Sequence, residues 1–221
     1  MLIGTGWMQL SGDATCNKND SDLYDFLLEQ FDHITGDDKH ILLNLCSPGW
    51  EAKLEKLFCG YIKDKIVRYN YRLNIESFKK HVGWQEKIPA GFEMRYFDVN
   101  SGDFLDKHNN GRAFWFPESK RFGFALVKDN NIISDCISVY YEKRAYNSET
   151  ARVVEIGIDT KEEFRRRGYA FLTCLAFIDY CLSHDYEPNW GCWNYKPESQ
   201  ALAKKLGFEE ISQRNVMILE K

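Results

Sequence analysis

A basic turn in the last third of the chain has the composition of a phosphate-binding site. The segment Arg-Arg-Arg-Gly-Tyr-Ala at residues 165–170 follows a β-branched run at 153–160 and precedes an amphipathic helical pattern. The first N–H groups of a helix have no intrahelical acceptor, and the helix dipole adds about half a positive charge there. Glycine lets the backbone approach phosphate oxygens closely. The spacing therefore predicts a site for a phosphorylated ligand; a solvated basic turn or a nucleic-acid patch is the alternative interpretation.

The cysteines and histidines show no spacing that is typical of a metal site or a disulfide framework. The seven cysteines are odd in number and include no Cys-x-x-Cys pair. Cys46, Cys136, Cys174 and Cys192 stand in apolar runs, where cysteine acts as a small hydrophobic residue. We therefore expect a reducing compartment, no metal, and no nucleophilic role for Cys192.

The bulk composition indicates an ordinary globular chain. Its 221 residues, 44% of them hydrophobic and 28% charged, suit one large domain or two small ones. The net charge of -4 disfavours nucleic acid as a partner, because binding driven by counterion release from nucleic acid needs an excess of Lys and Arg. The same charge mildly favours a cationic substrate. No apolar run approaches the roughly 20 residues of a membrane helix, and residues 1–10 lack signal-peptide features. We expect a cytoplasmic protein that binds no nucleic acid and no membrane.

The elements around the basic turn are predicted most clearly in the second half of the chain. Asp129-Asn130-Asn131 supplies turn residues that tolerate positive φ between two strand-like runs. A short helix is expected to begin at Ser101. The strands are predicted at 92–97, 122–128, 132–141, 152–160, 190–193 and 210–219, and the longer helices at 168–183 and 198–206.

The pattern of residues 1–80 predicts a smaller α/β unit and contains no recognisable catalytic or binding motif. The Gly- and Pro-containing stretch at 81–92 is the best candidate boundary, so we assign domains to residues 1–85 and 90–221. The first of these contains predicted strands at 2–10, 41–45 and 66–73, a helix through 31, and a second helix capped by Ser47.

Residues 90–221 resemble the GNAT superfamily of acyl-CoA-dependent N-acyltransferases. The family signature, Gln/Arg-x-x-Gly-x-Gly/Ala after a strand, is matched within residues 165–170. The segment 201–208, which ends in Leu-Gly-Phe, is similar to the second family motif, and Asn194 fits the Asn that precedes that helix. The resemblance implies an α/β (α+β) GNAT fold, with a mixed central sheet flanked by helices beside the smaller N-terminal α/β unit.

A finer pattern is similar to one bacterial subgroup of this superfamily. The pattern consists of Ile158-Asp159-Thr160, then Trp190-x-Cys192-x-Asn194, then Ser199. That subgroup has an N-terminal α/β extension, which corresponds to residues 1–80, and includes relatives of the acetyltransferase that confers zwittermicin resistance.

The resemblance implies that the chain binds acetyl-CoA. In this family the strand before the turn separates from the next parallel strand, and the pantetheine arm lies in the gap. Gly157 in mid-strand fits a close ligand approach, with a plain packing role as the alternative. The turn amides would hold the pyrophosphate, whereas Lys204 and Lys205 are interpreted mainly as a solvated helix face. The implied cofactor-binding residues are Gly157, Ile158, Asp159, Thr160, Arg165, Arg166, Arg167, Gly168, Tyr169, Ala170, Asn194 and Ser199.

The family reaction is direct attack of an amine on the thioester, which needs a base and an oxyanion donor. Glu155, inside an apolar strand, is the candidate general base; a structural charge paired with Arg152 is the alternative. A backbone N–H near Ile158 is the expected oxyanion donor.

The usual general acid is missing. Many members have a Tyr about four residues before the Gly of Leu-Gly-Phe, and Ala203 occupies that position here. Tyr195, Ser199 or water would replace it, or the thiolate would leave unaided.

These residues predict an N-acetyltransferase that transfers an acetyl group from acetyl-CoA to a primary amine of a small molecule in a ternary complex. A regulatory acyl-CoA-binding protein and a protein or peptide acetyltransferase are the alternatives, and a homodimer stays open. The acceptor is not encoded in any recognisable pattern. Several aromatic residues would either line its pocket or belong to the core, namely Trp84, Trp115, Trp190, Trp193, Tyr140 and Tyr141.

Overall fold

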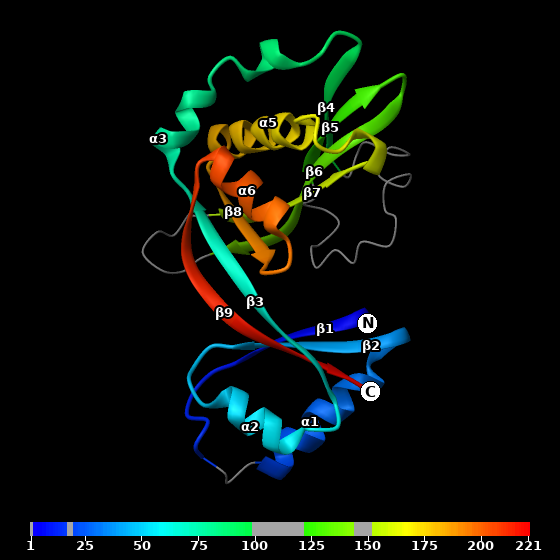
Figure 1. Ribbon diagram of the computed structural model, residues 1–221, viewed down its shortest axis with the longest axis vertical. Helices are drawn as coiled ribbons and strands as arrows, with labels where there is room; N and C mark the ends of the chain where they lie inside the picture. The colour runs from blue at the N-terminus through cyan, green and yellow to red at the C-terminus, as the bar shows by residue number, and fades with distance from the viewer. Residues whose placement is uncertain (1, 17–19, 99–121, 144–151) are drawn as a thin grey trace. The chain divides into compact units, whose positions relative to one another are not determined.

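The computed structural model describes residues 2–16, 20–98, 122–143 and 152–221 (Figure 1). The chain forms two compact units, of which the second comprises Asn70–Gly191 and Lys196–Ile211. The first unit comprises Met1–Tyr69, Cys192–Tyr195 and Ser212–Lys221. Within the described ranges, every helix is too short or too polar to cross a bilayer.

The first unit is built on strands from both ends of the chain. Strand β1 pairs with β2 in parallel, β2 pairs with β9 antiparallel, and the hydrogen-bonded order is β1-β2-β9-β3. Its elements are β1 (Leu2–Leu10), α1 (Asp20–Asp32), β2 (Ile34–Leu45), α2 (Trp50–Leu57), the start of β3 (Ile62–Leu73) and the end of β9 (Phe208–Glu220).

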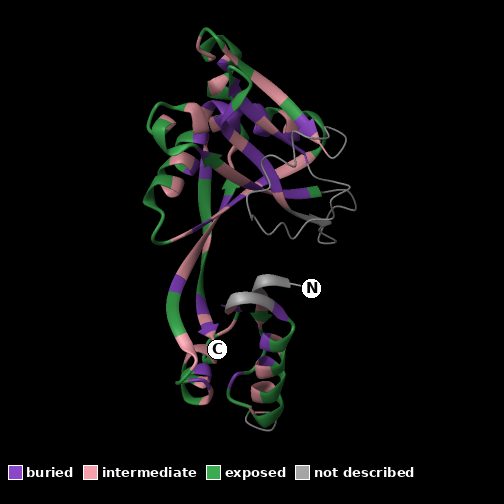
Figure 2. Ribbon diagram, turned by 90° about the vertical axis from the view of Figure 1, so that its right-hand side faces the viewer, coloured by how far each residue is buried: buried purple, intermediate pink, exposed green. Residues whose placement is uncertain are grey.

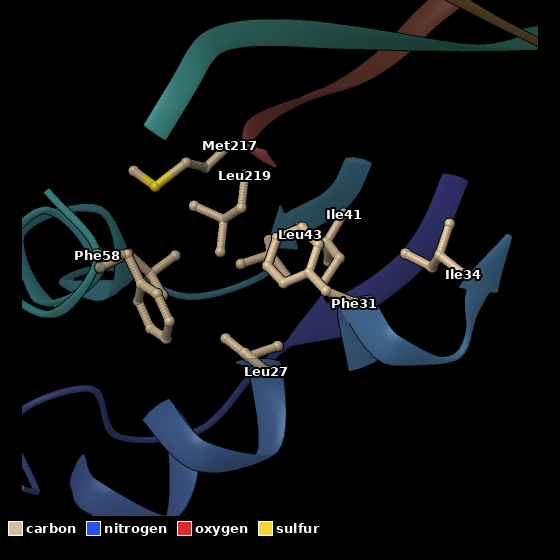
Figure 3. Packing of buried hydrophobic residues seen from close by; sticks show 9 residues of the cluster. Leu27, Phe31, Ile34, Ile41, Leu43, Phe58, Met217 and Leu219 are labelled. Atoms are coloured by element: carbon tan, nitrogen blue, oxygen red, sulfur yellow. The ribbon is translucent and has the colours of Figure 1, made fainter. Parts of the chain in front are cut away.

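The core of this unit lies between its sheet and its two helices (Figure 3). Met217 and Leu219 of β9 are completely buried there. Alternation along a strand places these two residues on one face, where burying each side chain stabilises the unit by about 1.5–3 kcal/mol. The other members of the cluster are Leu27, Phe31, Ile34, Ile41, Leu43, Leu54 and Phe58.

The units therefore divide the chain differently from the domains predicted at 1–85 and 90–221. The first unit ends at Tyr69 and includes the C-terminal strand from Ser212 onward. The physical reason is strand pairing: β9 runs antiparallel to β2, with Met217 opposite Leu43. Local composition around residues 81–92 carries no signal of that long-range pairing.

Two local expectations in the first unit are wrong. The residue before α2 is Gly49, with φ of 87° and no side-chain cap, whereas the Ser47 hydroxyl donates to Gly12 O at 2.7 Å. Cys46 is exposed, while Cys136, Cys174 and Cys192 are buried as expected.

The second unit is a mixed sheet flanked by helices, which agrees with the predicted fold class. Its strands follow the order β8-β7-β6-β5-β4, and only the β7–β8 pair is parallel. The elements are α3 (Ile75–Phe78), η1 (Lys79–His81), η2 (Trp84–Lys87), β4 (Phe92–Asp98), β5 (Phe122–Lys128), β6 (Asn131–Lys143), β7 (Arg152–Thr160), η4 (Glu162–Phe164), α5 (Tyr169–Ser183), β8 (Tyr186–Trp193) and α6 (Pro197–Leu206).

Helix α5 packs on β5, β6 and β7 and anchors the site that precedes it. Of the predicted core face, Leu175 and Ile178 are completely buried, whereas Phe171 and Leu182 are only partly buried. Residues 172–178 are all buried, so the buried surface of α5 is wider than one face. Buried positions of this unit lie on its strands and on α5, whereas α6 has many exposed positions (Figure 2).

The predicted β5–β6 hairpin is confirmed. Asp129 and Asn130 have φ values of 49° and 58°, and Lys128 pairs with Asn131. The helix expected from Ser101 and the aromatic Trp115 fall outside the described residues.

Candidate active site

The basic turn joins η4 to α5, and its backbone is held in an unusual conformation. Gly168 is the N-cap of α5 with φ of 83°, and Arg166 also has a positive φ, of 60°. The first hydrogen bond that leads into the helix runs from Leu172 N–H to Gly168 O. Among the described residues, no backbone acceptor pairs with the N–H groups of 166–171. These groups are available to an external acceptor, as at other helix starts.

The space beside Gly168 is open. A Cβ added at this position would meet no atom within 4 Å. Glycine is required by the left-handed φ, which other L-residues adopt only at a cost of about 1–2 kcal/mol. The same residue keeps the approach to the helix start unobstructed, which is the arrangement that a bound oxyanion needs.

The three arginines of the turn differ in their contacts. Arg165 Nε donates to Thr160 O at 3.0 Å, and its Nη2 lies 3.9 Å from Asp159 Oδ1. This side chain therefore ties the turn to the end of β7. The Arg167 guanidinium lies 5.6 Å from the ring centroid of Phe164. These contacts restrict the side chains of Arg165 and Arg167, which the sequence placed among the cofactor-binding residues.

Tyr169 is anchored by neighbouring aromatic rings. Its ring centroid lies 5.0 Å from that of Phe92 and 6.3 Å from that of Phe164. The Tyr169 ring, at the first position of α5, therefore packs against these two rings. The next residue, Ala170, has only a small side chain. The backbone amide is the group that Tyr169 presents at the helix start.

Strands β7 and β8 separate just before the turn. Their parallel pairing begins at Arg152 opposite Tyr186 and ends at Glu155 opposite Asn189, although β7 continues to Thr160. The pairing of β7 with β6 on its other side continues to Thr160. Among the described strands, none pairs with the β8-facing edge of β7 after Glu155, and this is the separation that the family resemblance implied.

The backbone groups on this open edge can be assigned from neighbouring hydrogen bonds. Lys161 N–H donates to Ile133 O at 3.0 Å, and Asp159 O accepts from Ser134 Oγ at 2.9 Å, so both residues face β6. Backbone direction alternates along a strand, and Ile158 and Thr160 therefore face the open edge. Gly157 and Asp159 direct their backbone groups toward β6 instead.

Gly157 has a packing reason of its own. A Cβ at this position would overlap Val139 Cγ1 and lie 3.4 Å from Ile137 Cγ1. Val is stiff at χ1, so it could not move aside freely. The alternative interpretation of this glycine, close packing within the sheet, thus has a direct structural basis.

Glu155 is half-buried and stands at the last β7–β8 pair. Ile158 lies opposite Cys136, whose thiol is within hydrogen-bond reach of Cys174 on α5. Even-numbered β7 side chains near the turn therefore face α5, and Glu155 projects from the opposite face. A carboxylate is thus placed beside the point where the strands separate.

The position of the missing general acid is closed to solvent. Ala203 is completely buried in α6. Ser199 Oγ accepts a hydrogen bond from Trp190 Nε1 at 3.2 Å, which makes Ser199 a support for the buried Trp190. Tyr195 belongs to the first unit, where burial and the nearby Asp64 carboxylate raise the pKa of its hydroxyl.

Asn194 also belongs to the first unit and is tied to β3. Its N–H donates to Val67 O at 2.8 Å, and its Oδ1 accepts from Val67 N–H at 3.1 Å. Of the aromatic candidates for an acceptor pocket, Trp84 and Trp190 are core residues, with 8% and 1% exposure. Trp193 is half-buried in the first unit.

Comparison with known proteins places this geometry in a family. A sequence model described as GNAT acetyltransferase matches residues 1–216. The chain belongs to the GNAT acetyltransferase family. It is accordingly an acetyltransferase, and the match includes the first unit as well as the strand–turn–helix site. GNAT proteins use acetyl-CoA as acyl donor.

Individual GNAT relatives agree with this assignment. The chain is 27% identical over 227 residues to YdfB, an uncharacterized N-acetyltransferase of Bacillus subtilis, covering 97% of this chain and 79% of the relative. A GCN5-related N-acetyltransferase-like protein of Streptococcus suis has a TM-score of 0.64 at 21% identity, covering 89% and 75% of the two chains. A conserved Staphylococcus epidermidis protein of unknown function has a TM-score of 0.60 at 13% identity, covering 97% and 84%. At these identities the two structures show the shared fold.

Sequence reasoning missed one cluster in this GNAT chain. Lys205, interpreted as solvated, has its ammonium 4.5 Å from the Phe171 ring centroid, and His81 packs edge-on against the same ring. These residues come from α6, α5 and η1, and no local spacing connects them. The one feature of the sequence that could have indicated the cluster is the presence of basic residues in the last turn of α6.

Proposed function

We propose that this protein transfers an acetyl group from acetyl-CoA to a primary amine of a small molecule. One observation carries the proposal: the open edge of β7 is followed, after η4, by unpaired N–H groups at the start of α5. The β7 edge offers backbone groups to an extended amide-containing arm, and the N–H groups of residues 166–170, here called the cradle, are offered to a diphosphate. Acetyl-CoA has these two parts in this order.

The cofactor contacts that we propose are mainly with the backbone. N–H groups of residues 166–170 would hold the pyrophosphate, supported by the α5 dipole. Ile158 and Thr160 would hold the pantetheine arm at the open β7 edge. Arg165 acts indirectly because it is tied to Thr160 O. Gly157 and Asp159 would shape the strand without donating to the arm.

In the proposed reaction, Glu155 accepts a proton from the amine as the nitrogen attacks the thioester carbon. The N–H of Ile158 donates to the carbonyl oxygen as negative charge develops there. The C–N bond forms, the C–S bond breaks, and the thiolate takes a proton from water. A thiolate is a good enough leaving group to depart without a side-chain acid, which suits the buried Ala203.

A small cationic acceptor is favoured by the charge of the chain. The net charge of -4 attracts an alkylammonium substrate more readily than an anionic one. The half-buried Glu155 carboxylate offers the corresponding local charge. A peptide or protein amine is the alternative acceptor, and an amine panel that contains both classes separates the two.

The test is Glu155→Gln, assayed for turnover and for coenzyme A binding. We expect kcat to fall about 10²–10⁴-fold, which is the usual contribution of general base catalysis, with an unchanged Kd for coenzyme A. Glu163→Gln, an exposed change in η4, is the matched control and should retain turnover. Normal turnover by Glu155→Gln would exclude the base role. Binding of coenzyme A without turnover of any amine by the unmodified protein would favour the regulatory alternative.

A further inference from the structure

Three side chains form a basic–aromatic cluster next to the first turn of α5. The Lys205 ammonium lies 4.5 Å from the Phe171 ring centroid. The His81 ring stands at 88° to the same ring with a centroid separation of 5.2 Å. His81 Nε2 lies 3.1 Å from Lys205 O. Phe171 directly follows Ala170, so the cluster adjoins the residues that we propose to hold the pyrophosphate.

The two basic side chains are available to an anion. Within the described part of the chain, the Lys205 ammonium has no carboxylate within 4.0 Å. A carbonyl oxygen can only accept, so His81 Nε2 carries the hydrogen and donates to Lys205 O. Among the hydrogen bonds of the described residues, none involves His81 Nδ1, which leaves this atom for another partner.

The cluster is held in place by close packing between α3 and the end of α6. Asn74 N–H donates to Gly207 O at 2.9 Å, and Asn74 Nδ2 donates to Glu209 Oε1 at 2.6 Å. A Cβ at Gly207 would lie 3.1 Å from Phe78 N. Because η1 continues directly from α3, this contact positions His81 against the end of α6. The pair is therefore a fixed arrangement of donors on a rigid support.

We propose that Lys205 and His81 bind the 3′-phosphate of coenzyme A and thereby select the phosphorylated form of the cofactor. Coenzyme A carries this phosphate on its ribose, next to the diphosphate. A phosphate dianion is matched by the Lys205 ammonium and by the His81 ring, which both contact the Phe171 ring. The proposal rests on the proposed function, because it assumes that the diphosphate occupies the start of α5.

The experiment compares coenzyme A with 3′-dephospho-coenzyme A by isothermal titration calorimetry. We expect the unmodified protein to bind coenzyme A about tenfold more tightly, as expected for one charge-assisted hydrogen bond. Lys205→Gln should remove most of this preference, leaving at most about threefold, while the Kd for the dephospho form stays unchanged. His81→Gln should reduce the preference by about threefold.

Lys204→Gln is the matched control, because Lys204 is an exposed lysine on the same helix turn. It should retain the full preference. The proposal is overturned if Lys205→Gln keeps the preference, or if it weakens both ligands equally. Failure of the unmodified protein to bind either ligand would overturn the proposed function as well, whereas equal binding of both ligands would overturn this inference alone.

Discussion

Gly168 and Gly207 occupy opposite ends of two helices and have nearly the same backbone conformation. Gly168 precedes α5 with φ of 83°, and Gly207 follows α6 with φ of 97°. A Cβ at Gly168 would meet nothing within 4 Å, whereas one at Gly207 would lie 3.1 Å from both Phe78 N and Ser77 Cβ. Both glycines thus have a left-handed backbone, but Gly168 has open space beside it and Gly207 is closely packed.

This difference separates two uses of one residue type. At Gly168 the missing side chain leaves space beside unpaired N–H groups, which suits a ligand. At Gly207 the missing side chain lets α3 approach the end of α6, which suits packing. Substitution at the first site should therefore affect binding, and substitution at the second should affect stability.

The largest effect is expected from Gly168→Asp. A carboxylate in the open space would repel the pyrophosphate, so coenzyme A binding should fall at least 100-fold, equivalent to about 2.7 kcal/mol. Calorimetric titration measures the loss. Gly168→Ala is the control: its strained φ should lower stability by about 1–2 kcal/mol while binding falls less. Near-normal coenzyme A binding by Gly168→Asp would refute the cradle assignment.

Gly207→Ala should destabilise the protein by about 1–3 kcal/mol, because it combines a strained φ with a backbone contact that cannot yield. For a chain of this size, thermal unfolding should shift downward by roughly 2–10 °C. The dephospho-coenzyme A affinity should change little, since the cradle is untouched. A melting temperature equal to that of the unmodified protein would contradict the packing role.

Gly157→Ala tests a third glycine, which lies next to the proposed cofactor-binding residues but has close packing neighbours. The added methyl group would overlap Val139 Cγ1, and overpacking of this kind typically costs about 1–3 kcal/mol. The double variant with Val139→Ala should recover part of the lost stability, measured by urea unfolding. If the double variant is no more stable than Gly157→Ala, the overlap is not the cause.

The smallest effect is expected from Arg166→Ala. Backbone amides carry the proposed pyrophosphate site, so loss of this exposed side chain should weaken coenzyme A binding by only about two- to fivefold. Arg165→Ala serves as a comparison, because Arg165 holds the end of β7 through Thr160 O. A 100-fold loss in Arg166→Ala would mean that the guanidinium, and not the backbone, dominates.

Much of the second unit could be predicted from the sequence because its signals are local. The hairpin at Asp129-Asn130, the start of α5 at Gly168 and the end of α6 at Gly207 each depend on the φ preferences of a few neighbouring residues. The strands and helices around them follow from hydrophobic periodicity. Two motifs at a fixed separation were enough to indicate the family.

Contacts between distant residues could not be predicted in this way. Nothing in the pattern of β9 indicates that Met217 and Leu219 complete the core of the first unit. Similarly, alternation along β7 is visible in the sequence, but the choice of which backbone groups face β6 depends on register. Register therefore distinguishes Ile158 and Thr160 from Gly157 and Asp159.

The sequence by itself determined the family, the order of the elements around the site and the position of the turn that we propose to bind phosphate. These depend on conformational preferences within a few residues and need no partner from elsewhere in the chain. Only the tertiary structure decided that β7 separates from β8 after Glu155, that Val139 occupies the space over Gly157, and that Lys205 meets Phe171. Each of these depends on packing and strand register between distant segments, for which one-dimensional periodicity holds no information.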